Sequence, residues 1–141
     1  MTNQDRQRIV EQYLDVTIRH DFAGMRALMS EDFTIWMVPS AVDHGIPVPL
    51  EGRENFLEFA GRLSSGGTMW EPRGHKIEQF LFSEDSVAVR VRLIGDFANG
   101  DIYDNEYVFI YRFAGDRICE MREFTDTMFI DKLFRKAGLR H

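Results

Sequence analysis

Glu123 is the side chain of this sequence with the clearest potential for proton transfer. It lies in an apolar stretch near the C-terminus, where it alternates with Met121 and Thr125. Alternate residues of a β-strand point to the same face, so these three side chains should share one face. A carboxylate buried among apolar groups loses hydration, which raises its pKa and suits it to acid/base chemistry near neutral pH. We therefore predict that Glu123 is a catalytic acid/base residue.

An ion pair is the alternative role for Glu123. Arg122 is its direct neighbour, and Arg90 and Arg92 lie on a neighbouring predicted strand. A structural pair with one of these guanidinium groups, or exposure at a dimer interface, would make Glu123 a structural residue instead.

Several aromatic and polar residues are candidates to surround that carboxylate. Tyr13 lies on the apolar stripe of the first predicted helix, and its buried hydroxyl could bond either Glu123 or the backbone. Asn105, Tyr107 and Phe109 alternate along one predicted strand and so share a face, which lines either a ligand cavity or an ordinary sheet core. Trp36 could stack on a ligand or pack in the core or at a dimer face.

The sequence gives no pattern for a metal or cofactor. Acidic and histidine side chains are scattered at spacings that match no known site, namely Asp43, His44, His75, Asp104 and Glu106. Cys119 is the one cysteine, which excludes an intramolecular disulfide and a zinc site built on paired cysteines. We expect neither metal nor cofactor.

The periodicity of the chain predicts the elements that must position these side chains. Apolar residues at helical spacing predict a first helix that carries its apolar stripe over 9–17 and breaks around 20–21. The same spacing predicts helices from about 22 to 29 and from 52 to 63, and a last one from 127 to 136. Asn3 or Thr2 could cap the first helix, and Asp126 or Thr127 is placed to cap the last. Strands are predicted at 33–38, 75–82, 86–96, 101–114 and 117–124, with a proline-containing loop at 39–51.

This order of elements predicts an α+β fold in which an antiparallel meander curves around the N-terminal helices. Closure of such a sheet leaves one apolar cleft, which is a suitable site for a small hydrophobic ligand. We expect the outer face of the sheet to mediate a homodimer, because it would expose apolar residues such as Val89, Val91, Leu93, Val108 and Ile110.

Length and charge narrow the classes of function. The 141 residues suit a single domain, 1–141, and the net charge of −6 argues against nucleic acid as a partner. No apolar run reaches the roughly 20 residues that span a bilayer, and the first residues are polar, so we expect no membrane association and a cytoplasmic location.

Three segments of the chain resemble known families. VEQYLDVTIRHDFAGMRALMSEDFTIWM resembles the opening of bacterial ketosteroid isomerases, with Tyr13 and the pattern of Asp21, Gly24 and Leu28. LEGRENFLEF resembles a helix start of the nuclear transport factor 2 superfamily. YDNEYVFIYRFAGDRICEMREFTDT resembles the last strands of SnoaL-like polyketide cyclases and of the phenazine proteins PhzA and PhzB. The resemblance implies the cone-shaped ketosteroid isomerase-like fold, with Met121, Glu123 and Thr125 facing its cavity.

The isomerase resemblance implies roles that this chain fills only in part. Tyr13 matches the tyrosine that donates a hydrogen bond to the dienolate oxygen. The general-base aspartate corresponds to Met37, and the second, protonated aspartate corresponds to Phe109. Without those two carboxylates, steroid isomerisation by that mechanism is excluded. Met37 and Phe109 become candidate substrate-binding residues instead.

The other resemblances point to the last strand. Arg122, Glu123 and Phe124 match a triplet of the phenazine proteins in which the glutamate is an acid/base residue, but the histidine that pairs with it there corresponds to Phe59 here. Some SnoaL-like cyclases carry their base at the end of this strand, which makes Asp126 a second candidate, although we favour its role as a helix cap.

These observations predict an enzyme that transfers protons without a cofactor. The reaction would be an isomerisation, cyclisation or dehydration of a hydrophobic cyclic substrate, with Glu123 as acid/base and Tyr13 as hydrogen-bond donor. Met121 and Phe59 are expected to contact the substrate. The alternative is a domain of the same fold that only binds a small ligand or only forms dimers.

Overall fold

The computed structural model describes residues 1–37, 49–65, 71–97 and 99–138. These residues form the helices α1 (Asn3–Ile18), α2 (Phe22–Leu28), α3 (Arg53–Ser65) and α4 (Thr127–Lys136). The strands are β1 (Met29–Trp36), β2 (Leu50–Glu51), β3 (Glu71–Phe82), β4 (Ser86–Asp96), β5 (Ile102–Ala114) and β6 (Arg117–Thr125). The predicted order of elements is confirmed, except that β2 was not expected and β1 and β3 begin four residues early. Most of the predicted loop at 39–51 lies outside the described residues.

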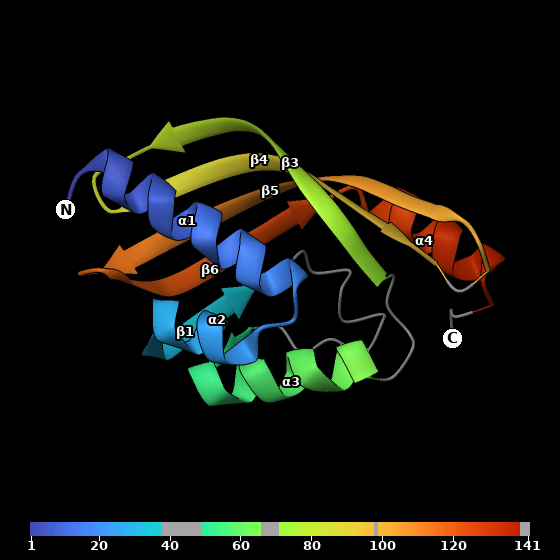
Figure 1. Ribbon diagram of the computed structural model, residues 1–141, viewed down its shortest axis with the longest axis horizontal. Coiled ribbons are helices and arrows are strands. Elements are labelled where there is room, and N and C mark those ends of the chain that lie inside the picture. Colours follow the sequence, from blue (N-terminus) through green and yellow to red (C-terminus); the bar gives the residue numbers. More distant parts are fainter. Residues whose placement is uncertain (38–48, 66–70, 98, 139–141) are drawn as a thin grey trace.

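The strands form one curved sheet in the order β2-β1-β6-β5-β4-β3. Strands β3 to β6 are an antiparallel meander, whereas β1 runs parallel to β6 and pairs Ile35 with Met121 and Trp36 with Arg122. Helix α1 crosses the concave face of this sheet, and α2 and α3 lie beside its β1 side (Figure 1). The predicted α+β fold with a curved sheet around N-terminal helices is confirmed.

Local sequence explains where the first helices begin and how closely they pack. Thr2 and Asp5 form a capping box at the start of α1. Asp21 caps α2 by accepting a hydrogen bond from the Gly24 backbone at 2.9 Å. A Cβ atom on Gly24 would lie 2.9 Å from Val16 Cγ1 and 2.6 Å from Asp21 Oδ2, so only glycine permits this close approach of α2 to α1.

The core lies between α1 and the concave face of the sheet. Val10 of α1, Met29 and Phe33 of β1, and Val89 and Val91 of β4 are fully buried there. Our expectation that Val89 and Val91 contribute to an outer dimer face is therefore wrong, and Leu93 also faces inward, toward the pocket. Alternation along β4 places Ala88, Arg90 and Arg92 on the outer face instead.

Within the described part of the chain, no helix combines the length and the apolar character needed to cross a membrane.

Candidate active site

A pocket of about 320 Å³ opens between the concave face of the sheet and the helices. This volume is at the lower end of the range for small-molecule sites, roughly 300–1,000 Å³. Its wall is mainly apolar and aromatic. The wall includes Tyr13, Thr17, His20, Phe22, Met37, Phe59, Ser64, Glu71, Tyr103, Tyr107, Phe109, Tyr111, Met121, Glu123, Thr125 and Thr127.

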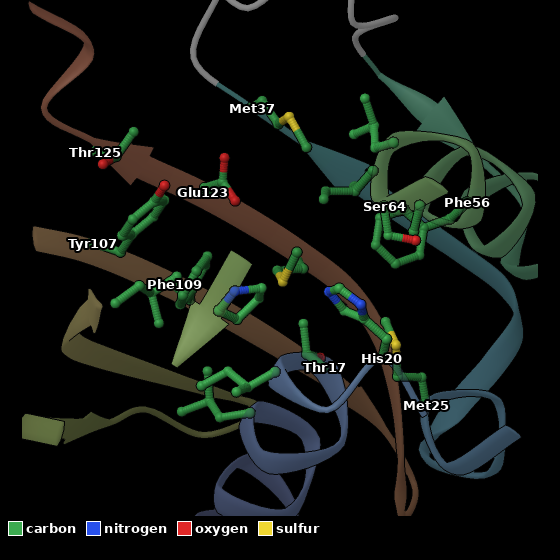
Figure 2. Close-up of a pocket in the computed structure, with 18 of the residues that line it drawn as sticks. Thr17, His20, Met25, Met37, Phe56, Ser64, Tyr107, Phe109, Glu123 and Thr125 are labelled. Atoms are coloured by element: carbon green, nitrogen blue, oxygen red, sulfur yellow. The ribbon is translucent and has the colours of Figure 1, made fainter. Parts of the chain in front are cut away.

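Glu123 projects from the middle of β6 into this pocket (Figure 2). Its register partner on β5 is Phe109, and Met121 and Thr125 flank it on the same face. Burial raises the pKa of the Glu123 carboxyl from its ordinary value of 4.5 to about 7. A group with this pKa can both accept and release a proton near neutral pH.

The arginines that could have neutralised Glu123 are engaged elsewhere. Arg122 points to the opposite face and binds Glu120 at 3.0 Å, while its guanidinium lies 5.0 Å from the centre of the Trp36 ring. Arg90 pairs with Glu106 and Arg92 with Asp104, each at 2.9 Å on the outer face. Among the described residues, Glu123 makes neither an ion pair nor a hydrogen bond, so the ion-pair alternative is not supported.

A hydrogen-bonded group of side chains fixes the sheet beside Glu123. The hydroxyls of Tyr103 and Tyr107 bond each other, and Asn105 Nδ2 donates to the Tyr103 hydroxyl at 3.3 Å and to Thr125 Oγ1 at 2.8 Å. Asn105 is thus buried on the expected face but holds β5 to β6 rather than lining the pocket. Burial raises the pKa of Tyr103 to about 12 and raises that of Tyr107 well above its ordinary value, so both hydroxyls stay protonated.

Tyr13 and Tyr111 pack edge to face in the pocket wall, with ring centres 5.8 Å apart. The Tyr13 hydroxyl donates to the thioether sulfur of Met29 at 3.7 Å, a weak bond, and thus to neither of the partners that the sequence left open, Glu123 and the backbone. The Tyr111 hydroxyl makes no hydrogen bond within the described residues. Burial raises its pKa well above the ordinary value, and Glu123 adds to this effect. Tyr111 is therefore the tyrosine that retains a donor for a ligand.

Two candidates from the sequence lie away from the pocket. Asp126 is the N-cap of α4 and accepts a hydrogen bond from the Phe129 backbone at 3.1 Å, which is the role that we favoured for it. Trp36 is 36% exposed on the outer face because its neighbour Ile35 points inward and alternation turns the indole away. Neither Asp126 nor Trp36 therefore lines the pocket.

The positions that the sequence resemblances match to catalytic groups face the pocket. Met37, Phe59 and Phe109 all line it, together with Tyr107 and Met121. At these positions the chain has apolar side chains, so Glu123 is the carboxylate that remains inside the cavity. Glu71, which also contributes to the wall, is exposed at the start of β3.

His20 also lines the pocket, and its imidazole can form hydrogen bonds, but the sequence patterns did not predict it as a site residue. It lies between α1 and α2, and its imidazole projects into the pocket (Figure 2). A single histidine at a predicted helix break carries no signal for a site, because only the packing of α1 and α2 on the sheet brings it there. No cluster of three metal-ligating side chains occurs among the residues that the structure describes, and the predicted candidate His44 lies outside them.

Comparison with known proteins agrees with this architecture. The SnoaL-like domain model matches residues 10–121. An NTF2-like protein of unknown function from Burkholderia pseudomallei superimposes with a TM-score of 0.78 at 16% identity, covering 94% of this chain and 98% of its own. A candidate SnoaL-like polyketide cyclase from Jannaschia sp. CCS1 gives a TM-score of 0.74 at 21% identity, with 92% and 90% covered.

TerC, whose crystal structure was determined with polyporic acid, gives a TM-score of 0.78 at 16% identity and covers 93% of this chain and 98% of its own. No functionally curated protein matches the sequence. At these identities the structural neighbours establish the fold, and the domain model establishes the family. The chain belongs to the SnoaL-like domain family.

Proposed function

We propose that this protein is an enzyme that transfers protons, without a cofactor, on a hydrophobic cyclic small molecule. The observation that carries the proposal is the unpaired Glu123 carboxyl, with a pKa raised to about 7, in an apolar pocket. Isomerisation, cyclisation and dehydration all begin or end with such a transfer next to a carbonyl or hydroxyl group. The SnoaL-like polyketide cyclase among the structural neighbours is consistent with this class.

In the proposed reaction, Glu123 removes a proton from a carbon next to a carbonyl group and returns it at another position. The negative charge that develops on the carbonyl oxygen requires a hydrogen-bond donor. We assign that role to the Tyr111 hydroxyl, because the Tyr13 hydroxyl is directed to Met29. The mainly apolar wall lowers the polarity around these groups, which strengthens the donor and raises the pKa of the Glu123 carboxyl to about 7.

Proton exchange tests this proposal without knowledge of the natural substrate. β-Tetralone is a bicyclic ketone whose protons next to the carbonyl exchange with deuterated water, and NMR follows the exchange. The wild-type protein should accelerate it above buffer, and Glu123→Gln, which keeps the size and the hydrogen bonding, should lose about 100-fold of that acceleration. Saturable binding of β-tetralone with equal exchange in both proteins would refute Glu123 as the base and favour a ligand-binding domain.

We also propose that two copies of the chain associate through the outer face of the sheet. Phe124 is 47% exposed there and is the register partner of Val108, while Ile110 pairs with Arg122 beside the exposed Trp36 ring. Ion pairs such as Arg90–Glu106 and Arg112–Glu120 lie beside this apolar patch. An apolar centre with a polar rim is the usual arrangement of a protein interface.

A further inference from the structure

His20 adopts a backbone conformation that is unusual for a residue with a side chain. Its φ angle is 55°, and it is the one non-glycine residue with positive φ in the described ranges. The other positive values, at Gly52, Gly100, Gly115 and Gly138, belong to glycines. L-residues avoid this left-handed region because Cβ approaches the carbonyl oxygen, although histidine enters it more often than most.

The cause of this conformation is the way in which α1 ends. The His20 backbone donates to the Thr17 carbonyl at 3.1 Å, and the Asp21 backbone donates to the Val16 carbonyl at 2.9 Å. These two bonds form a Schellman motif, in which the residue after the C-cap is usually glycine. A histidine at that position conflicts with the local backbone preference, and such conflicts concentrate at functional sites.

The side chain of His20 is directed into the pocket and remains free to bind. Its ring lies parallel to that of Phe22, at 6.2 Å between centres, which fixes its orientation. Neither of its nitrogens has a hydrogen-bond partner within the described residues. A neutral imidazole offers one donor and one acceptor, so the ring can bind either a carbonyl or a hydroxyl oxygen.

Three hydroxyl groups of the pocket are committed to hydrogen bonds within the protein itself. The Thr17 hydroxyl donates to the Tyr13 carbonyl at 2.7 Å, and the Ser64 hydroxyl donates to the Gly61 carbonyl at 3.1 Å. Thr125 Oγ1 donates to the Glu106 carbonyl at 2.9 Å. Glu123 on the sheet and His20 on the helical layer both project free polar atoms into the cavity (Figure 2). The Tyr111 hydroxyl is also without a hydrogen-bond partner among the described residues.

We infer that His20 is a ligand-binding residue that recognises an oxygen atom of the substrate at a point separate from Glu123. The ligand class is then a flat cyclic compound with two oxygen substituents, one near Glu123 and the other near His20, and with apolar rings between them. This inference rests on the proposed function only in placing the ligand in this pocket. It concerns recognition and not proton transfer.

Binding of matched naphthalene probes tests this inference. β-Naphthol has one hydroxyl group, and a naphthalene diol with hydroxyls at opposite ends has two. Dissociation constants from calorimetry should show that the wild-type protein prefers the diol. His20→Gly should remove that preference, so that the variant loses about tenfold more affinity for the diol than for β-naphthol, the difference expected for one hydrogen bond.

Thermal unfolding of the same variant separates binding from folding. Glycine suits the left-handed conformation, so His20→Gly should unfold at the same temperature as wild type or at a higher one. His20→Asn, which also tolerates this conformation, provides a second folded variant. An unchanged diol preference in both variants would overturn the inference. A lower unfolding temperature of the variants, together with an equal loss of affinity for β-naphthol and the diol, would overturn it as well.

The two proposals can fail separately. In one outcome, His20→Gly loses the diol preference and the wild type does not exchange β-tetralone protons. This result would support His20 as a binding residue and refute the proposed enzymatic function. Exchange that depends on Glu123, with a diol preference that does not depend on His20, would refute only the role of His20.

Discussion

Glu123 on β6 and Phe109 on β5 are direct register partners, and both face the pocket. Opposed residues of antiparallel strands have their Cβ atoms about 4.5–5.5 Å apart, so an aromatic ring is the immediate neighbour of the carboxyl group. The resemblance to ketosteroid isomerases matches Phe109 to a position that carries a carboxylic acid there. In this chain the phenyl ring gives Glu123 an apolar neighbour, and burial raises the pKa of the carboxyl to about 7.

The raised pKa predicts a specific pH dependence of stability. The native state keeps the Glu123 proton up to a pH of about 7, whereas the unfolded chain releases it near 4.5. The native state therefore binds more protons between these values, so the contribution of Glu123 to stability falls as the pH rises through that window and is constant above it. Glutamine does not ionise and avoids this loss.

Glu123→Gln should thus be more stable than wild type by about 1–3 kcal/mol at a pH of about 8.5, with no difference at a pH of about 4. Urea unfolding of both proteins at the two pH values measures this. A stability difference that is the same at both would show that Glu123 is ionised normally in the native protein.

Asp126 should matter for stability and not for turnover. Asp126→Ala removes the N-cap of α4 and should cost about 1 kcal/mol, whereas Asp126→Asn retains a capping side chain and should cost little. Both variants should exchange β-tetralone protons at the wild-type rate. If Asp126→Asn folds normally but loses exchange, Asp126 and not Glu123 is the base.

Two matched tyrosine variants test the assignment of the hydrogen-bond donor. Tyr111→Phe removes a hydroxyl that has no partner among the described residues, and should slow β-tetralone exchange by about tenfold or more. Tyr13→Phe removes a weak bond to the Met29 sulfur and should have a smaller effect. The reverse order of effects would return the donor role to Tyr13, as the resemblance to ketosteroid isomerases implies.

The proposed dimer predicts which surface changes alter the mass in solution. Light scattering at micromolar concentration should give twice the chain mass of 16.5 kDa for the wild type. Phe124→Glu places a charge in the centre of the outer apolar patch and should give a monomer. Met128→Glu, at an even more exposed apolar residue on α4, should leave the dimer intact. A monomeric wild-type protein would refute the interface.

The alternation of residues along the strands was readable from the sequence. Turn residues fix where each strand of the meander starts, and a period of two then decides that Tyr107, Phe109, Met121 and Glu123 share the concave face. The cap at Asp126 was readable for the same reason, since a cap depends on residues that are adjacent in sequence. These features follow from local geometry.

The remaining features depend on contacts between residues distant in sequence. The parallel pairing of β1 with β6 decides that Ile35 faces inward and Trp36 outward, and no local pattern encodes that pairing. The Tyr13 hydroxyl binds Met29 because α1 crosses the sheet at that angle. His20 enters the pocket because α1 and α2 meet over the sheet. The sequence by itself determined which residues of β5 and of β6 share a face and which carboxylate is the candidate acid, but it placed Val89 and Val91 of β4 on the wrong face. Only the tertiary structure decided which groups surround that acid, because those neighbours are set by packing between elements and not by period along the chain.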